Sequence, residues 1–206
     1  MLQIQTILPN TLELLNRLSL RPEMQGMRLV GGTALALQLG HRQSIDLDFF
    51  GKPAASQDEI LNMLETFGLY RIRNRTNNIL QLIVNNVMID IVDYSRYHWI
   101  DPPLQYGSIT LASPKDIAAM KINAIEGRGS KKNFVDIYFL LQQYSLEELL
   151  GFYAQKYPNH SIFRALLSLS YLNDAEEQAM PTMLIPTPWE DVKTAVSLAV
   201  KRYQEQ

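Results

Sequence analysis

Short apolar segments separated by turn residues fill the first half of the chain. Runs that alternate apolar and polar positions, many with β-branched side chains, predict strands. The predicted strands cover residues 27–30, 44–50, 70–76, 79–84, 87–94 and 108–112. Asparagine pairs separate the three central runs, and such pairs favour tight hairpins because they tolerate positive φ. The sequence therefore predicts an antiparallel meander that extends the first two strands, followed by an aromatic and proline-rich loop over 97–107.

Helical periodicity marks three segments of the first half and nearly all of the second half. The predicted helices cover residues 9–18, 33–39, 56–67, 115–126, 132–143, 145–157, 160–168 and 189–203. Ser56, followed three residues later by Glu59, has the pattern of a capping box. Because the pattern turns purely helical after the last predicted strand, we expect an α/β (α+β) domain over 1–112 and a helical domain over 113–206.

The composition is typical of a globular protein and excludes several function classes. Of the 206 residues 47% are hydrophobic, so the chain can bury a substantial core. The formal net charge is −2, so any nucleic-acid site must be a local patch. The absence of cysteine excludes disulfides, zinc–thiolate sites and thiol catalysis. No segment approaches the roughly 20 apolar residues of a membrane helix, and no signal-peptide pattern opens the sequence, so we expect a soluble cytoplasmic protein with no membrane partner.

Two aspartates in the second predicted strand are the strongest candidates for chemistry. Asp46 and Asp48 stand two residues apart, so in a strand both side chains point to one face. Two carboxylates on one face repel each other unless protons or a cation neutralise them, and a hard divalent metal does this well. An isolated pair of this kind is also found at solvated strand edges, so the pair alone leaves both interpretations open.

A third aspartate, Asp90, lies inside an apolar run. A carboxylate is rarely buried without a partner, and Asp46 and Asp48 are its natural partners if the two strands are neighbours. Three acidic ligands on adjacent strands suit nucleotidyl transfer, in which Mg²⁺ neutralises phosphate oxygens and one carboxylate accepts the proton of the attacking hydroxyl. The pattern predicts Asp46, Asp48 and Asp90 as catalytic residues and metal ligands. Asp93, on the opposite face near the strand end, is expected to have a structural role or to face solvent.

Two further features are candidates for binding phosphate. The Gly31-Gly32 turn precedes a predicted helix, whose free N–H groups and positive dipole end suit a phosphate. Thr33 can cap that helix or contact a phosphate oxygen, although glycine turns are also common structural elements. Lys121, set among apolar residues of a predicted helix, either extends its amine to the surface or reaches a nucleotide phosphate.

A stripe of arginines marks the third predicted strand. Arg71, Arg73 and Arg75 alternate, so a regular strand places all three on one face. The simpler interpretation is a solvated sheet face. The alternative is a local anion-binding or RNA-facing stripe.

A second basic cluster lies between two predicted helices of the C-terminal half. Arg128, Lys131 and Lys132 are either solvated charge or a contact for a triphosphate or RNA. Asp136, one turn into the next helix, can pair with a base of this cluster and is expected to be structural. The histidines have no metal-ligand spacing and are expected to be non-catalytic; they are His41, His98 and His160.

The glycine turn and the aspartates resemble a known signature. Gly31-Gly32-Thr33 followed by Asp46-Leu47-Asp48 is similar to the nucleotidyltransferase superfamily motif, in which a Gly-Gly or Gly-Ser turn precedes a D-x-D strand. Three longer stretches resemble the AbiEii/AbiGii toxin family of nucleotidyltransferases in particular. They are GGTALALQLGHRQSIDLDFF, LASPKDIAAMKINAIEGRGSKKNFVDIYFLL and SYLNDAEEQAMPTMLIPTPWEDVK, and they spread over nearly the whole chain.

The resemblance implies a nucleotidyltransferase-like fold, with a small mixed β-sheet flanked by helices and a helical C-terminal region. It also implies an NTP donor, Mg²⁺ as cofactor, and Asp46 and Asp48 as metal ligands. The residues that it assigns to nucleotide binding are Gly31, Gly32, Thr33, Arg42, Ser44 and Lys121. Asp90 is added to this set from strand alternation, not from the resemblance.

The resemblance also carries an expected function. Members of the family are often toxins of toxin–antitoxin systems, and some add nucleotides to tRNA. We therefore expect transfer of NMP from an NTP to an RNA (tRNA-like) or protein acceptor, with an antitoxin protein as partner. The chain departs from the family pattern at Asn133, where aspartate is common. That departure motivates an alternative, a catalytically weak nucleotidyltransferase-fold protein that acts as an interaction module.

Overall fold

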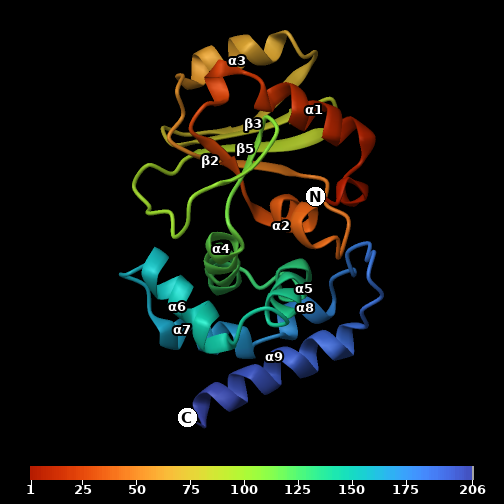
Figure 1. Ribbon diagram of the computed structural model, residues 1–206, viewed down its shortest axis with the longest axis vertical. Coiled ribbons are helices and arrows are strands. Elements are labelled where there is room, and N and C mark those ends of the chain that lie inside the picture. Colours follow the sequence, from red (N-terminus) through yellow and green to blue (C-terminus); the bar gives the residue numbers. More distant parts are fainter. Residues whose placement is uncertain (206) are drawn as a thin grey trace. The chain divides into compact units, whose positions relative to one another are not determined.

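The computed structural model describes residues 1–205, and these residues form two compact units (Figure 1). The first unit comprises Met1–Gln38, Ser44–His98 and Pro102–Ala112. The second unit comprises Leu39–Gln43, Trp99–Asp101 and the chain from Ser113 onward. Two short segments from the first half of the sequence thus belong to the helical unit.

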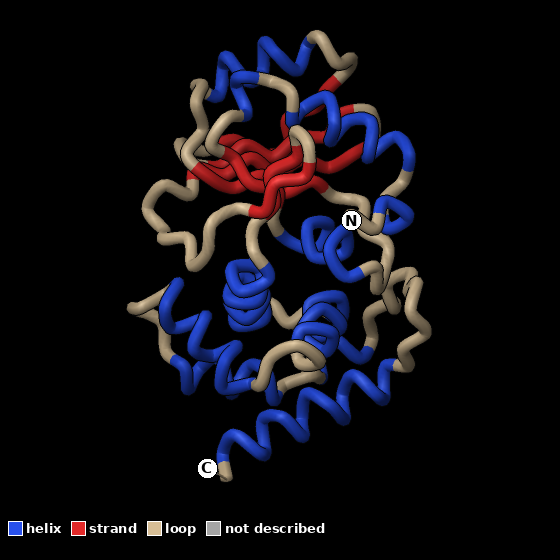
Figure 2. Tube along the Cα trace, viewed as in Figure 1, coloured by secondary structure: helices blue, strands red, loops and turns tan. Residues whose placement is uncertain are grey.

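The first unit is built on a mixed sheet of seven strands, all within residues 1–205 (Figure 2, red). The strands are β1 (Met27–Leu29), β2 (Leu47–Gly51), β3 (Tyr70–Arg75), β4 (Ile79–Val84), β5 (Val87–Asp93), β6 (Leu104–Tyr106) and β7 (Ile109–Leu111). Their spatial order is β3-β4-β5-β2-β1-β7-β6. β2 pairs in parallel with β5 and β1 with β7, and the other neighbours are antiparallel. The predicted mixed sheet is confirmed, and β3, β4 and β5 form the expected meander.

Helices flank this sheet on both faces. They are η1 (Ile4–Thr6), α1 (Pro9–Ser19), η2 (Pro22–Met24), α2 (Gly31–Leu39) and α3 (Gln57–Glu65). α1 and α3 lie on one face of the sheet and α2 on the other (Figure 1). In β4, Leu80, Leu82 and Val84 are buried, whereas Ile79 and Ile83 are half-buried. Because side chains alternate along a strand, the apolar core lies mainly on one face of the outer strands.

Local sequence signals set several element ends. Ser56 and Glu59 form the predicted capping box, in which each side chain accepts a hydrogen bond from the other's backbone N–H. In the turn between β4 and β5, Asn85 and Asn86 have φ of 49° and 66°. Asparagine tolerates this left-handed conformation, so the predicted tight hairpin is confirmed.

Two strand boundaries differ from the prediction. β2 begins at Leu47, so the segment 44–46 leads into the strand and is not part of it. β6 lies inside the region predicted as a loop, and it pairs with β7 across a turn at Gly107, where φ is 61°. A three-residue edge strand that follows two prolines carries no periodic pattern, and the sequence therefore does not reveal it.

The second unit is helical. Its helices are α4 (Pro114–Gly127), α5 (Lys131–Leu140), α6 (Leu146–Lys156), α7 (Ile162–Ser170), α8 (Asn173–Glu176) and α9 (Trp189–Gln204). α4 packs against α5, α6 and α7, and α9 packs against the same three helices. No helix in the described part of the chain is long and apolar enough to cross a membrane.

A buried ion pair holds the segment Trp99–Asp101 in the helical unit. Lys156 Nζ donates to Oδ1 of Asp116 at 2.7 Å, and both side chains are buried. The Asp116 carboxylate also accepts backbone hydrogen bonds from Ile100 at 2.9 Å and Asp101 at 3.2 Å. These bonds explain why a segment distant in sequence from the helices belongs to their unit.

Candidate active site

The glycine turn of the first unit lies directly against Asp48. Gly31 begins α2 with φ of 69°, a left-handed conformation that favours glycine. A Cβ at this position would overlap Oδ2 of Asp48, so glycine is needed for space as well as for conformation. The first N–H groups of a helix have no partner within the helix and carry a partial positive charge. The Asp48 carboxylate therefore lies next to a group of backbone donors.

Asp48 and Asp90 face the same side of the sheet. They are register partners on the parallel strands β2 and β5, and both are half-buried. Adjacent strands are about 4.8 Å apart, so two paired carboxylates of one face are close neighbours. The two strands are neighbours, which was the condition for this pairing, and the structure brings these two predicted site residues together.

A row of polar side chains continues from Asp90 across the sheet. Gln81, its register partner on β4, donates from Nε2 to Oδ2 of Asp90 at 2.8 Å. Asn74 on β3 in turn donates to Oε1 of Gln81 at 3.4 Å. Sequence reasoning missed Gln81, although it interrupts an apolar run just as Asp90 does. The hydrogen bond fixes the orientation of the Asp90 carboxylate.

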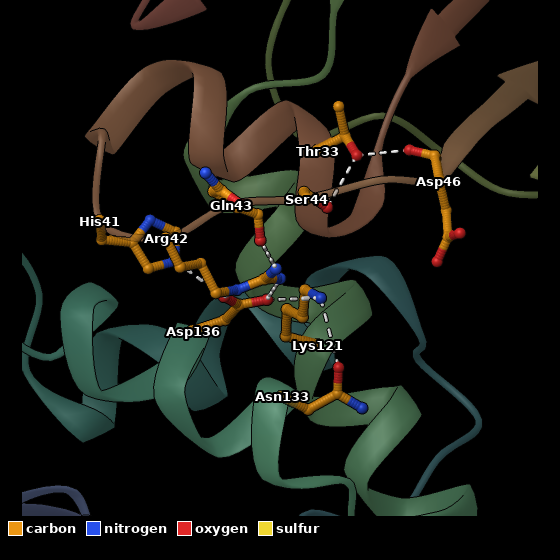
Figure 3. Close-up of polar contacts among 9 residues, drawn as sticks. All are labelled: Thr33, His41, Arg42, Gln43, Ser44, Asp46, Lys121, Asn133 and Asp136. Atoms are coloured by element: carbon orange, nitrogen blue, oxygen red, sulfur yellow. Dashed lines mark hydrogen bonds and ion pairs between the residues drawn. The ribbon is translucent and has the colours of Figure 1, made fainter. Parts of the chain in front are cut away.

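Asp46 lies in the segment that leads into β2, where Thr33 and Ser44 hold the backbone (Figure 3). The Thr33 hydroxyl donates to the carbonyl oxygen of Asp46 and shares a hydrogen bond of 2.8 Å with the Ser44 hydroxyl. Both hydroxyls are buried. The structure thus gives Thr33 and Ser44 a part in positioning Asp46, and their contact with a nucleotide stays a prediction.

The donor set of this sheet face suits Mg²⁺. Within residues 1–205, no three side chains of the types His, Cys, Asp or Glu converge closely enough to form a preassembled metal site. Mg²⁺ does not require one, because it is usually held by one or two carboxylates, several waters and the phosphates of the substrate. The Asp48–Asp90 pair fits this requirement, and the role of Asp46 as third ligand stays a prediction.

Asp136 is the centre of a buried charge cluster in the second unit (Figure 3). Arg42 binds both carboxylate oxygens, at 2.7 and 2.9 Å, and Lys121 Nζ lies 2.6 Å from Oδ2. His41 Nε2 lies 2.8 Å from Oδ1. Burial raises the pKa of Asp136, but the charges of Arg42 and Lys121 and the hydrogen bonds from Arg42 and His41 outweigh it, so the pKa lies well below its ordinary value.

This cluster corrects one expectation. The position of Asp136 allowed a pair with Arg128, Lys131 or Lys132, but Asp136 pairs instead with Lys121 of the preceding helix and with Arg42, which is remote in sequence. The proline-rich loop before α9 holds one of them, Arg42, in place. Gln43 N donates to Thr182 O at 2.8 Å, and Arg42 forms a bridge with Met183. Long-range pairing of this kind leaves no periodic signal in the sequence.

Asn133 adds a neutral hydrogen-bond acceptor to the cluster. Its Oδ1 accepts a hydrogen bond of 3.2 Å from Lys121, as an aspartate would, but it carries no charge. Arg42 and Lys121 both pair with the carboxylate of Asp136, and Asn133 adds no negative charge beside them.

A pocket adjoins Asn133 within the same unit. It has a volume of about 550 Å³, and its lining includes Arg128, Ser130, Lys132 and Asn133. Lys131, by contrast, is buried, donates to the carbonyl of Glu176 at 3.0 Å and lies over the ring of Trp189. The predicted basic cluster is thus divided between one structural lysine and two exposed cations that line a pocket.

The comparison with known families decides the identity of the chain. A model of the family described as nucleotidyl transferase AbiEii toxin, Type IV TA system, matches residues 13–199. The chain belongs to this family. A curated relative, the uncharacterized protein aq_aa25 of Aquifex aeolicus (strain VF5), is 34% identical over 183 residues, which cover 86% of this chain and 87% of that protein.

Solved structures share the fold of this AbiEii-family chain. MenT4, a nucleotidyltransferase toxin from Mycobacterium tuberculosis, matches with a TM-score of 0.60 and 13% identity, over 93% of this chain and 80% of that one. JHP933 from Helicobacter pylori matches with a TM-score of 0.59 and 15% identity, over 97% and 94%. The family assignment predicted from the sequence is confirmed, and the protein is a nucleotidyltransferase enzyme.

Proposed function

We propose that this AbiEii-family enzyme is metal-dependent and transfers NMP from an NTP to the 3′-hydroxyl of an RNA acceptor, as the toxin of a toxin–antitoxin system. One observation carries the proposal. The paired carboxylates of Asp48 and Asp90 share a sheet face, and the glycine turn at the start of α2 lies against Asp48. Nucleotidyl transfer requires carboxylates that can bind a metal and, beside them, backbone N–H groups that can bind phosphate.

In the proposed reaction, the acceptor hydroxyl oxygen attacks the α-phosphorus of the NTP. A new P–O bond forms, the bond from the α-phosphorus to the bridging oxygen breaks, and pyrophosphate leaves. One carboxylate of the Asp48–Asp90 pair accepts the hydroxyl proton. Asp48, Asp90 and Asp46 would hold Mg²⁺, which would neutralise the phosphate charge. The N–H groups of Gly31 and Gly32 orient the phosphate at the helix start.

Two cations belong to the proposed nucleotide-binding set. Guanidinium and ammonium groups suit a polyanionic triphosphate. We assign Arg42 and Lys121, with Thr33 and Ser44, to nucleotide binding on the basis of the family resemblance.

Labelled nucleotides test the proposal. The purified protein is incubated with each radiolabelled NTP, Mg²⁺ and total cellular RNA, beside the Asp46→Ala/Asp48→Ala double variant. We expect label to enter RNA with the wild type alone. Label in protein instead of RNA would identify a protein acceptor and overturn the RNA assignment. No label with any NTP, together with no Mg²⁺-dependent NTP binding by calorimetry, would contradict the proposed activity.

A further inference from the structure

The sheet face that carries Asp48 and Asp90 extends outward over β4 and β3. Register pairing places Ile83 of β4, Met88 of β5 and Arg71 of β3 on this face. Ile83 and Met88 are half-buried, in contrast to the buried residues of the opposite face. The outer part of the face therefore presents apolar and polar side chains instead of a closed core.

A β-bulge separates the three arginines of β3. Arg71 pairs with Ile83, but Arg75 pairs with Leu80, and the register shifts between Ile72 and Asn74. An extra residue in one strand moves all later side chains to the opposite face. The expectation that all three arginines share one face is therefore wrong, because it assumed a regular strand.

The contacts of the arginines agree with this division. Arg75 binds α3, donating to Asp58 at 2.7 Å and Gln57 at 2.9 Å. Arg73 instead donates to Sδ of Met88 at 3.0 Å, which places its guanidinium on the face of Asp90. Arg71 and Arg73 are exposed, so two cations flank the outer edge of the carboxylate face.

A hollow of about 510 Å³ lies beside Arg71. Its lining comprises Leu69, Tyr70, Arg71, Ile83, Asn85 and Asn86. It combines a guanidinium, which binds phosphate, with apolar and amide groups, which contact bases. Single-stranded RNA is often bound on sheet faces in this manner, with bases against the side chains and phosphates on arginine.

We propose that this outer face, defined by Arg71, Arg73, Ile83 and Met88, binds the RNA acceptor strand just upstream of its 3′ end. The inference rests on the proposed function. From β5 to β3 there are two strand spacings, about 10 Å. A 3′-hydroxyl at the carboxylates thus places the phosphates of the preceding few nucleotides within reach of the two arginines. The carboxylates would repel those phosphates. The two arginines lie farther out on the sheet, where they can bind the phosphates instead.

The bulge supplies a matched control for the test. Binding of a fluorescent single-stranded RNA is measured by anisotropy for wild type, for the Arg71→Gln/Arg73→Gln variant and for Arg75→Gln, which alters the same strand on the opposite face. We expect the double variant to bind at least tenfold more weakly. Its salt slope should fall by about 1.4, at about 0.7 per lost phosphate contact. Arg75→Gln should bind RNA like the wild type.

A second measurement separates this inference from the proposed function. Mg²⁺-dependent NTP binding, followed by calorimetry, should be the same in the double variant and the wild type, which also shows that the variant is folded. Equal RNA binding by the double variant and wild type would overturn the RNA surface while leaving the enzyme assignment intact. Equal weakening by Arg75→Gln would also overturn it, and so would a wild type that labels protein but binds no RNA.

Discussion

At the level of single residues, the aspartates of this enzyme are of two kinds. Asp136 is fully buried, and Arg42 and Lys121 neutralise it within the folded chain. Asp48 and Asp90 are half-buried; the glycine turn lies beside Asp48, and the Gln81 amide donates to Asp90. The first arrangement satisfies a buried charge within the fold, and the second suits the proposed metal site.

Replacing Asp136 by asparagine should destabilise the protein strongly. The change removes the buried carboxylate that pairs with Arg42 and Lys121, and breaking a buried ion pair by removing one partner costs roughly 3–5 kcal/mol. Urea unfolding measures the loss, and Asp174→Asn, at an exposed position, is the control. An unfolding midpoint equal to that of the wild type would show that the cluster contributes little to stability.

The same variant should change the acid limb of the stability curve. The pKa of Asp136 is lower in the folded than in the unfolded protein, where it is about 3.9. Its contribution is therefore fully present above the unfolded pKa and declines as the pH falls below about 4. Between pH 5 and 2, the wild type should lose more unfolding free energy than Asp136→Asn. Parallel curves would contradict the pairing.

Replacing Gln81 by leucine should weaken metal binding through Asp90. The change keeps the side-chain size but removes the hydrogen bond that orients the carboxylate. Loss of a group that orients a metal ligand typically reduces activity or affinity about 10–100-fold. The Mg²⁺ concentration for half-maximal transfer should rise accordingly, whereas Gln105→Leu, on the edge strand β6, should leave it unchanged. No rise in Gln81→Leu would refute the positioning role.

Among the elements, the turn into α2 has the most exacting geometry. Gly31→Ala should lose about 1–2 kcal/mol of stability because of its positive φ, and should also lose transfer because its Cβ would displace Asp48. Gly107→Ala is a matched control, since Gly107 has φ of 61° but open space at the Cβ position. It should show the stability loss alone. Equal activity of the two variants would contradict the account.

Elements also show what the sequence could and could not predict. The capping box at Ser56 and the Asn85-Asn86 turn follow from local chemistry, and so they were predictable. The bulge in β3 was not, because one extra residue leaves the pattern of alternating arginines unchanged in the sequence. The start of β2 at Leu47 was also missed, since the hydrogen bonds of Thr33 hold residues 44–46 outside the strand.

At the scale of the whole chain, both units draw on residues remote in sequence. The sequence identified Asp90 as a candidate site residue because it interrupts an apolar strand. The pairing of β5 with β2 then places it beside Asp48. Arg42 and Asp136 are 94 residues apart, and no local pattern connects them. The resemblance to the AbiEii family supplied the nucleotidyltransferase function, which periodicity and composition alone do not contain.

Mn²⁺ binding tests most directly the proposal that the carboxylates of β2 and β5 bind the catalytic metal. Electron paramagnetic resonance measures Mn²⁺ binding in the presence of a non-hydrolysable NTP for wild type, Asp48→Asn and Asp93→Asn. Asp93 lies on β5 but on the opposite face from Asp90, so it is the control. We predict at least tenfold weaker Mn²⁺ binding for Asp48→Asn and unchanged binding for Asp93→Asn. Equal affinity of Asp48→Asn and wild type would contradict the account.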